Sequence, residues 1–225
     1  MPNSFRKYLT IGVVALALSI TAKSQTTAVQ DNDDLQSWND VQLTVGLSKK
    51  VDLYSAVTMR FGKNVSRLND GRFAIGLTFK PTGRFSFTPF VTLMRVRNSA
   101  GVFGPEYRIN LRGIYRFPVK AFGLSHRSLF EYRIRPTGNL WRFRPSVTFE
   151  KELPEHLAPG LKFFVTEEPI YDSASGRFSR NRFSVGFNKV LSKNLSLDIY
   201  YLRQGDNFSN PGAIDVIGTA WKIKL

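Results

Sequence analysis

The sequence predicts an all-β fold, a single antiparallel transmembrane β-barrel, on three observations. Apolar and polar side chains alternate with a period of two along most of the chain, which is the period of a β-strand. The chain begins with a segment typical of export. The connections between the alternating runs are short and long in turn, as short periplasmic turns and longer external loops are in outer-membrane barrels.

The export segment is expected to be a signal peptide over residues 1–24. A basic start precedes the apolar run 9–20, which suits a signal-peptide core and is shorter than the ~20 residues that a membrane-spanning helix needs. The small residues Ala22 and Ser24 favour cleavage before Gln25, with a retained anchor helix as the alternative. The pattern predicts Sec-type export and, together with a barrel, the outer membrane of a Gram-negative bacterium.

Residues 25–35 are polar and acidic and are expected to form a flexible lead-in or a short first strand, and residues 36–225 to form the barrel. Eleven strands can be identified, most of them near the ~9–11 residues that a tilted membrane strand needs. Bacterial barrels normally have an even number, so about 12 are expected. The twelfth would come from residues around 25–33, or one run has been divided wrongly. The strands are 38–47, 51–61, 72–80, 85–97, 106–117, both arms of 128–150, 161–169, 180–189, 195–203 and 214–225.

The hairpin 128–150 shows the alternation most clearly. Two runs flank a turn at 136–139, and Phe130, Tyr132, Phe143 and Phe149 share one face while Arg and Glu occupy the other. By contrast, the alternation in 85–97 loses its phase near Met94.

The charged faces are expected to line the lumen. An arginine side chain that faces lipid costs ~2–4 kcal/mol at the bilayer midplane. A shift of the strand register by one residue would turn several charged side chains to lipid, so this register is excluded for a membrane-embedded barrel. The aromatic face then meets lipid. The candidate lumen residues are Arg108, Arg112, Glu131, Arg133, Arg142, Arg144, Glu150, Arg180 and Arg182.

Several short motifs occur in a characteristic order. Ser37-Trp38 opens the first strand, Lys49-Lys50 forms a turn, and Glu-x-Arg or Arg-x-Arg strands follow at 106–108, 131–133, 142–144 and 180–182. This order resembles the outer-membrane β-barrel family named domain of unknown function 2490. The resemblance covers essentially the whole exported chain and implies a location and a fold. It implies no catalytic residues, because the family has no established activity.

The last strand indicates how the chain would enter the membrane. Gly218-x-x-Trp221-x-Ile223, ending at Leu225, resembles the C-terminal signal by which such barrels are recognised for insertion, although Ile217 stands where a polar residue is usual. The expected partners are therefore outer-membrane lipid and the barrel-insertion machinery.

The charged lumen leaves two main interpretations open. Arg and Glu on neighbouring strands could pair and close the barrel as a structural element. Alternatively, the lumen could be a narrow pore whose excess positive charge favours small anions. A third interpretation is that Arg or Lys near the rim binds lipid phosphates.

Composition limits the other functions. The formal charge is +15, and it falls to +12 without the signal peptide, which contains three basic residues and no acid. The basic residues are spread along alternating strand faces and do not form one patch. Export would also separate the protein from nucleic acid, so nucleic acid is not expected as a partner. No cysteine and only two histidines occur, so no metal site is expected, and no nucleotide fingerprint indicates a cofactor.

Two further alternatives follow from the strand faces. His126-x-Ser128 resembles the His-x-Ser pair of outer-membrane lipid A deacylases and lies on the apolar face, which makes a lipid acyl hydrolase one alternative. No acid is identified near the pair on that face, and the pair lies close to the short turn 118–123, on the periplasmic side. A soluble exported barrel that binds a ligand in an apolar cavity is the other alternative. No catalytic residue is assigned.

Overall fold

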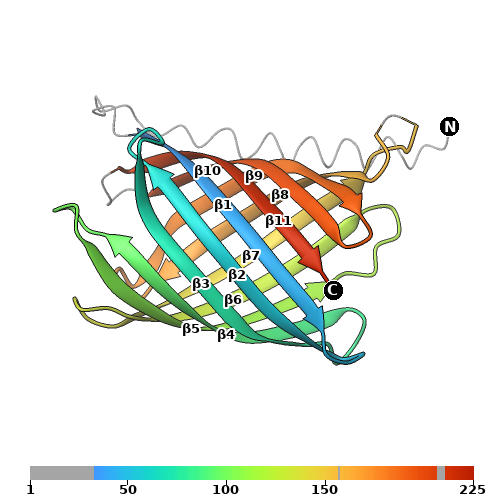
Figure 1. Ribbon diagram of the computed structural model, residues 1–225, viewed down its shortest axis with the longest axis horizontal. Coiled ribbons are helices and arrows are strands. Elements are labelled where there is room, and N and C mark those ends of the chain that lie inside the picture. Colours follow the sequence, from blue (N-terminus) through green and yellow to red (C-terminus); the bar gives the residue numbers. More distant parts are fainter. Residues whose placement is uncertain (1–32, 157, 207–210) are drawn as a thin grey trace. The chain divides into compact units, whose positions relative to one another are not determined.

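The structure is a computed structural model that describes residues 33–156, 158–206 and 211–225. These residues form one closed barrel of eleven strands, in which each strand pairs with its neighbours in the chain (Figure 1). The expected signal peptide lies outside the described residues, as do residues 25–32 of the expected lead-in. The strands are β1 (Asp33–Gly46), β2 (Val51–Gly62), β3 (Arg67–Phe79), β4 (Phe85–Arg97), β5 (Phe103–Arg116), β6 (Gly123–Ile134), β7 (Leu140–Glu152), β8 (Leu161–Asp172), β9 (Arg177–Ser192), β10 (Leu195–Asp206) and β11 (Ala213–Lys224).

The barrel closes with a parallel pair, β1 against β11, while the other ten pairs are antiparallel. Figure 1 shows these strands, blue and red, side by side with their arrowheads pointing the same way. An odd number of strands requires one parallel pair, because the first and last strands then run in the same direction. The eleven strands identified in the sequence are therefore the barrel, and the described residues contain no twelfth strand.

The two rims carry connections of similar length. At the carboxy-terminal rim, where Leu225 lies, the connections span two to eight residues, from 193–194 to 153–160. At the amino-terminal rim, where β1 begins, the connections between β2 and β9 span four or five residues. The sequence indicated longer loops at this rim. The difference arises because β3, β5, β8 and β9 continue through polar residues into the expected loops.

The two faces alternate along most of the wall, and the register of the described strands shifts at three places, between Arg60 and Phe61, between Ile170 and Tyr171, and between Leu195 and Ser196. In the hairpin formed by β6 and β7, Phe130 pairs with Phe143 and Tyr132 with Trp141 on the outside. The predicted loss of phase in β4 does not occur: Met94 is buried in the lumen, and its neighbours Leu93 and Arg95 are exposed outside. The sequence departs from the pattern there because the lumen accepts an apolar side chain, while the backbone keeps its period of two.

Aromatic rings pack against one another on the outer wall. Trp141 stacks on both Phe130 and Tyr171, with centroid separations of 5.8 and 5.1 Å. Most large apolar side chains of the described strands are exposed on this outer face, as expected for a wall that meets lipid. No helix among the described residues is long and apolar enough to cross a membrane.

Inside the barrel, a small apolar cluster lies along the β1–β11 seam. Trp38, Leu202, Ile214 and Val216 pack together there, with Tyr200 at the edge. Parallel pairing is slightly weaker per residue than antiparallel pairing. The cluster therefore adds packing on the lumen side of the pair that closes the barrel.

Candidate functional site

The lumen of the barrel contains two cavities, of about 280 and 630 Å³. Inward-facing side chains fill the interior of an eight-stranded barrel, while barrels of sixteen or more strands leave a wide channel. Eleven strands lie between these cases, so long side chains narrow the lumen without filling it. The smaller cavity, toward the amino-terminal rim, is called the amino-terminal cavity, and the larger one the carboxy-terminal cavity.

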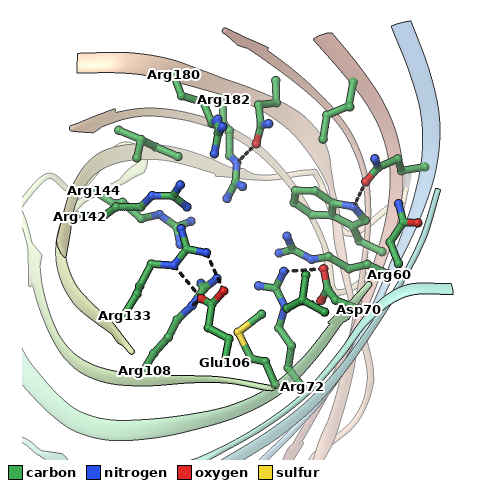
Figure 2. Close-up of a pocket in the computed structure, with 18 residues that line it drawn as sticks. Arg60, Asp70, Arg72, Glu106, Arg108, Arg133, Arg142, Arg144, Arg180 and Arg182 are labelled. Carbon is green, nitrogen blue, oxygen red and sulfur yellow. Dashed lines mark hydrogen bonds and ion pairs between the residues drawn. The ribbon is translucent and has the colours of Figure 1, made fainter. Parts of the chain in front are cut away.

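Arginine dominates the amino-terminal cavity. Eight arginines and two carboxylates line it, together with a few apolar and amide side chains. Figure 2 shows the arginines projecting from the wall toward a common central space. They come from strands β2, β3, β5, β6, β7 and β9, so the positive charge surrounds the cavity and is not confined to one side. The lining arginines are Arg60, Arg72, Arg108, Arg133, Arg142, Arg144, Arg180 and Arg182.

A chain of ion pairs begins at Glu106 on β5. Its carboxylate accepts hydrogen bonds from Arg108 Nε at 2.6 Å and from Arg133 Nε and Nη2 at 2.6 and 2.8 Å (Figure 2). All three side chains are buried, with residue exposures of 4 to 7%. Paired and hydrogen-bonded charges of this kind are tolerated away from bulk water because each neutralises the other.

The chain continues through Glu131 and Glu168. Arg108 Nη1 donates to Glu131 at 3.2 Å, and Arg144 Nη1 donates to the same oxygen at 2.9 Å. Arg144 then donates to Glu168 at 2.6 Å. Arg127 also pairs with Glu168, and Arg182 Nη1 approaches it to 3.3 Å.

This network therefore joins β5, β6, β7, β8 and β9 across the lumen face of five consecutive strands.

Other arginines form separate pairs. Arg142 donates to Asp172 at 2.5 Å, and Arg180 donates to Asp206 at 2.9 Å. Arg72 donates to Asp70 on its own strand at 2.5 and 2.9 Å (Figure 2). These pairs hold the long side chains against the wall, so the central space stays open.

The two cavities share four lining residues: Trp38, Arg60, Arg144 and Arg182. Trp38 and Arg60 are direct cross-strand partners, and the guanidinium carbon of Arg60 lies 3.4 Å from the centroid of the indole ring. The guanidinium of Arg182 lies 5.0 Å from the same ring and also donates to Gln204 at 2.6 Å. The four shared residues lie at the boundary between the cavities, and we refer to them as the boundary ring.

The carboxy-terminal cavity is less strongly basic. Seven basic and four acidic side chains line it, together with Ser, Thr and Asn. Arg112 lies over the rings of Tyr54 and Phe90, at 4.5 and 5.3 Å from their centroids. Lys222 pairs with Asp198 at 2.5 Å, close to the carboxy-terminal rim.

The structure places each charged residue that the sequence singled out. Arg108, Arg133, Arg142, Arg144, Arg180 and Arg182 line the amino-terminal cavity, and Arg112 and Glu150 line the carboxy-terminal one. Glu131 is buried at 4% exposure beneath its arginines.

Sequence reasoning missed four important lumen residues. The sequence indicates no motif at Arg60, and it marks Trp38 only as the opening of the first strand. Glu168 was missed because its neighbour Glu167 is also acidic, and alternation puts only one of them inside. Arg127 faces the lumen, between His126 and Ser128, whose His-x-Ser motif lies on the outer face of the same strand.

His126 and Ser128 lie on the outer wall, with Nε2 and Oγ 3.0 Å apart. The described strands also place Glu167 on that wall: His126 pairs with Val147 in the sheet register, and Val147 pairs with Glu167. Glu167 instead accepts a hydrogen bond from Asn181 at 2.5 Å, on the side away from His126. The pair therefore has the spacing of a nucleophile and base, but no carboxylate among the residues that the structure describes is bonded to the imidazole.

Guanidinium groups dominate the polar lining of the amino-terminal cavity. Guanidinium groups present several N–H donors in a plane and suit carboxylate and phosphate oxygens. Among the described residues, no group of three or more His, Asp or Glu is arranged to hold a metal ion.

Solved structures resemble the barrel. A structure described as the NanC porin in a rhombohedral crystal form matches with a TM-score of 0.50 and 10% identity, over 85% of this chain and 99% of that chain. The KdgM porin matches with a TM-score of 0.46 and 12% identity, over 76% of this chain and 90% of that one. The structure described as KdgM porin in complex with disordered oligogalacturonate matches with the same TM-score and identity, over 78% of this chain and 92% of that one. At these identities the likeness concerns the fold alone.

The family is identified by sequence. No curated protein sequence matches the chain. Residues 35–214 match the family described as "Protein of unknown function (DUF2490)". This confirms the family that the order of the Glu-x-Arg and Arg-x-Arg strands indicated. The match extends from β1 into β11 and covers most of the chain, which therefore belongs to this family.

Proposed function

We propose that this protein is an integral outer-membrane barrel whose lumen is a narrow pore that favours small anions. The observation that carries the proposal is the amino-terminal cavity, which keeps about 280 Å³ of space among eight arginines. A pore of this kind selects ions by the charge of its lining side chains. The proposal includes export by a signal peptide, insertion through the C-terminal strand, and an aromatic outer wall in contact with lipid.

The charge balance supports anions over cations. The lining of the amino-terminal cavity has an excess of six positive charges. Four further carboxylates, Glu131, Glu168, Asp172 and Asp206, pair with these arginines without lining the cavity, which reduces the excess to two. The excess stays positive after these ion pairs between described residues of the cavity and its wall are counted. A cleft lined by one sign of charge concentrates the opposite ion.

The alternative, a lumen closed by Arg–Glu pairs, explains part of the arrangement. The pairs do occur, and the boundary ring narrows the lumen. However, pairing against the wall leaves space beside the side chains, and the two cavities on either side of the boundary ring together have about 910 Å³. We therefore favour a constricted pore over a plug.

Planar-bilayer recording tests the proposal. Purified wild-type protein is expected to conduct, and Arg142→Glu is expected to shift the permeability ratio toward cations, since it replaces a positive charge of the cavity lining by a negative one. Lys193→Glu, in the turn between β9 and β10, makes the same change of charge outside both cavities and serves as the control. Absence of conductance would contradict the pore, and equal shifts in both variants would contradict its location.

The hydrolase remains a second candidate because of the 3.0 Å contact between His126 and Ser128. Lipid A from cells with and without the protein would be compared by mass spectrometry. Unchanged acylation, or a change that persists in Ser128→Ala, excludes this candidate. A soluble ligand-binding barrel would instead be extracted into buffer without detergent, while the proposed barrel stays with the outer membrane.

A further inference from the structure

The basic side chains of the lumen are held in two different ways. Twelve basic residues line the two cavities. Ten of them form an ion pair with a described carboxylate. The two exceptions within the described part of the chain are Arg60 and Arg112, and both lie over aromatic rings.

Arg60 is held by Trp38. Its guanidinium carbon lies 3.4 Å from the indole centroid, and its Nε is buried without a hydrogen-bond partner in the described structure. Asp40, on the same face of β1, accepts a hydrogen bond from Thr58 and makes no ion pair with Arg60. Asp70, directly opposite Arg60 in the register of β2 and β3, accepts hydrogen bonds from Arg72 at both of its carboxylate oxygens. Among the described residues, Arg60 therefore makes no ion pair with a carboxylate.

Arg112 is held by Tyr54 and Phe90. These rings meet edge to face at 5.6 Å, and Gly76 stands between them in the sheet register. A Cβ at Gly76 would lie 2.4 Å from the Cβ of Phe90, so the glycine makes room for this platform. The Nε of Arg112 is buried without a partner, and its Nη2 reaches only Thr88 Oγ1, at 3.5 Å.

An aromatic platform and a carboxylate have different consequences for an arginine. A carboxylate neutralises the charge and occupies the N–H donors at the edge of the guanidinium. A ring attracts the cation through its face and leaves the donors in the guanidinium plane available. An arginine on a ring is thus positioned in the lumen with its charge and donors still available to a ligand.

We propose that Arg60 and Arg112 are the two anion-binding sites of the lumen, and that each binds an oxyanion group such as a phosphate or a carboxylate. The passage of that anion through the barrel rests on the pore proposed above, whereas the binding itself does not. Arg60 belongs to the boundary ring, and Arg112 lines only the carboxy-terminal cavity. An anion that crosses the lumen would meet the two sites one after the other. Conduction with selectivity requires several sites of moderate affinity, so that an ion can enter and also leave.

Trp38 provides a direct readout for the first site. The chain has three tryptophans, and the other two, Trp141 and Trp221, face outward with 38 and 40% exposure. Replacing both by Phe leaves Trp38 as the single emitter, in contact with Arg60. Titration of this variant with inorganic phosphate in detergent micelles is expected to change the emission of Trp38 in a saturable way.

Matched variants identify the arginine responsible. Arg60→Gln is expected to weaken the apparent phosphate affinity about tenfold or more, the effect of losing one charge-assisted hydrogen bond. Lys193→Gln removes one positive charge from the turn between β9 and β10, outside both cavities, and is expected to leave the affinity within about twofold. A titration without saturation, or an equal loss in both variants, would overturn the first site.

The second site is tested by conductance. Arg112→Gln is expected to lower the anion-to-cation permeability ratio more than Lys193→Gln does. If wild-type barrels conduct anions but neither Arg60→Gln nor Arg112→Gln alters selectivity beyond that control, this inference fails and the pore stands. If Trp38 reports phosphate binding but the protein does not conduct, the pore fails and the Arg60 site stands.

Discussion

Replacing Glu168 by Gln is expected to destabilise the barrel by about 3 kcal/mol, because the change leaves buried guanidinium charges without their counter-charge. Glu168 is 4% exposed and pairs with Arg127, Arg144 and Arg182. Removing one partner of a buried pair typically costs about 3–5 kcal/mol. The lower end applies here, since the side chain of Arg127 is 31% exposed and can recover water.

The measurement is urea unfolding of the protein in lipid vesicles, followed by tryptophan emission and by heat-modifiable migration on SDS gels. Glu152→Gln is the matched control. Glu152 pairs with Lys162 at 2.9 Å, but its side chain is 75% exposed, so its loss should leave the unfolding free energy nearly unchanged. A loss at Glu168 below about 1 kcal/mol, or equal to that of the control, would refute the view that this network is a buried and balanced unit.

Two further variants test the packing and the outer wall. Gly186→Ala should cost about 1–3 kcal/mol in the same assay, because a Cβ there would lie 2.4 Å from the backbone oxygen of Ile199 and 2.6 Å from the Cβ of Tyr200, whereas a Cβ at Gly71 meets nothing within 4 Å. Equal costs for the two glycines would contradict this contact. Ile109 lies in the middle of β5 and is 56% exposed on the outer face, so Ile109→Arg should destabilise the barrel in vesicles by about 2–4 kcal/mol. Val102→Arg, in the connection at the rim, should cost about 0–1 kcal/mol. A cost at Ile109 no larger than that at Val102 would show that this face does not meet lipid.

The fold was predictable because its main determinant is local. A period of two defines both faces of a strand, and burying charge in lipid is costly enough to fix which face points inward. The shared outward face of Phe130 and Phe143 in the β6–β7 hairpin follows from the alternation alone, whereas their direct pairing does not. Strand boundaries were less predictable at the amino-terminal rim, where polar residues continue a strand as readily as they form a loop.

The closure of the barrel was not predictable from local pattern. The rule of even strand number led to the expectation of a twelfth strand, whereas β1 and β11 pair in parallel. Nothing in the alternation of either strand distinguishes a parallel from an antiparallel neighbour.

Specific partners in the lumen were also beyond local pattern. Glu131 stands directly opposite Arg142 in the register, yet it pairs with Arg108 and Arg144, while Arg142 pairs with Asp172. A long arginine side chain reaches diagonal neighbours as easily as the residue opposite, so sequence predicts which residues are inside and not which of them meet. For the same reason, the platform of Trp38 beneath Arg60 became evident only in three dimensions.

The sign of the reversal potential of a single wild-type barrel, measured in a planar bilayer under a tenfold gradient of potassium chloride, tests the central claim most directly. An arginine-lined pore with a positive excess is expected to give a potential displaced toward the chloride equilibrium value. A potential displaced toward the potassium value, or a barrel that inserts without conducting, would contradict the account.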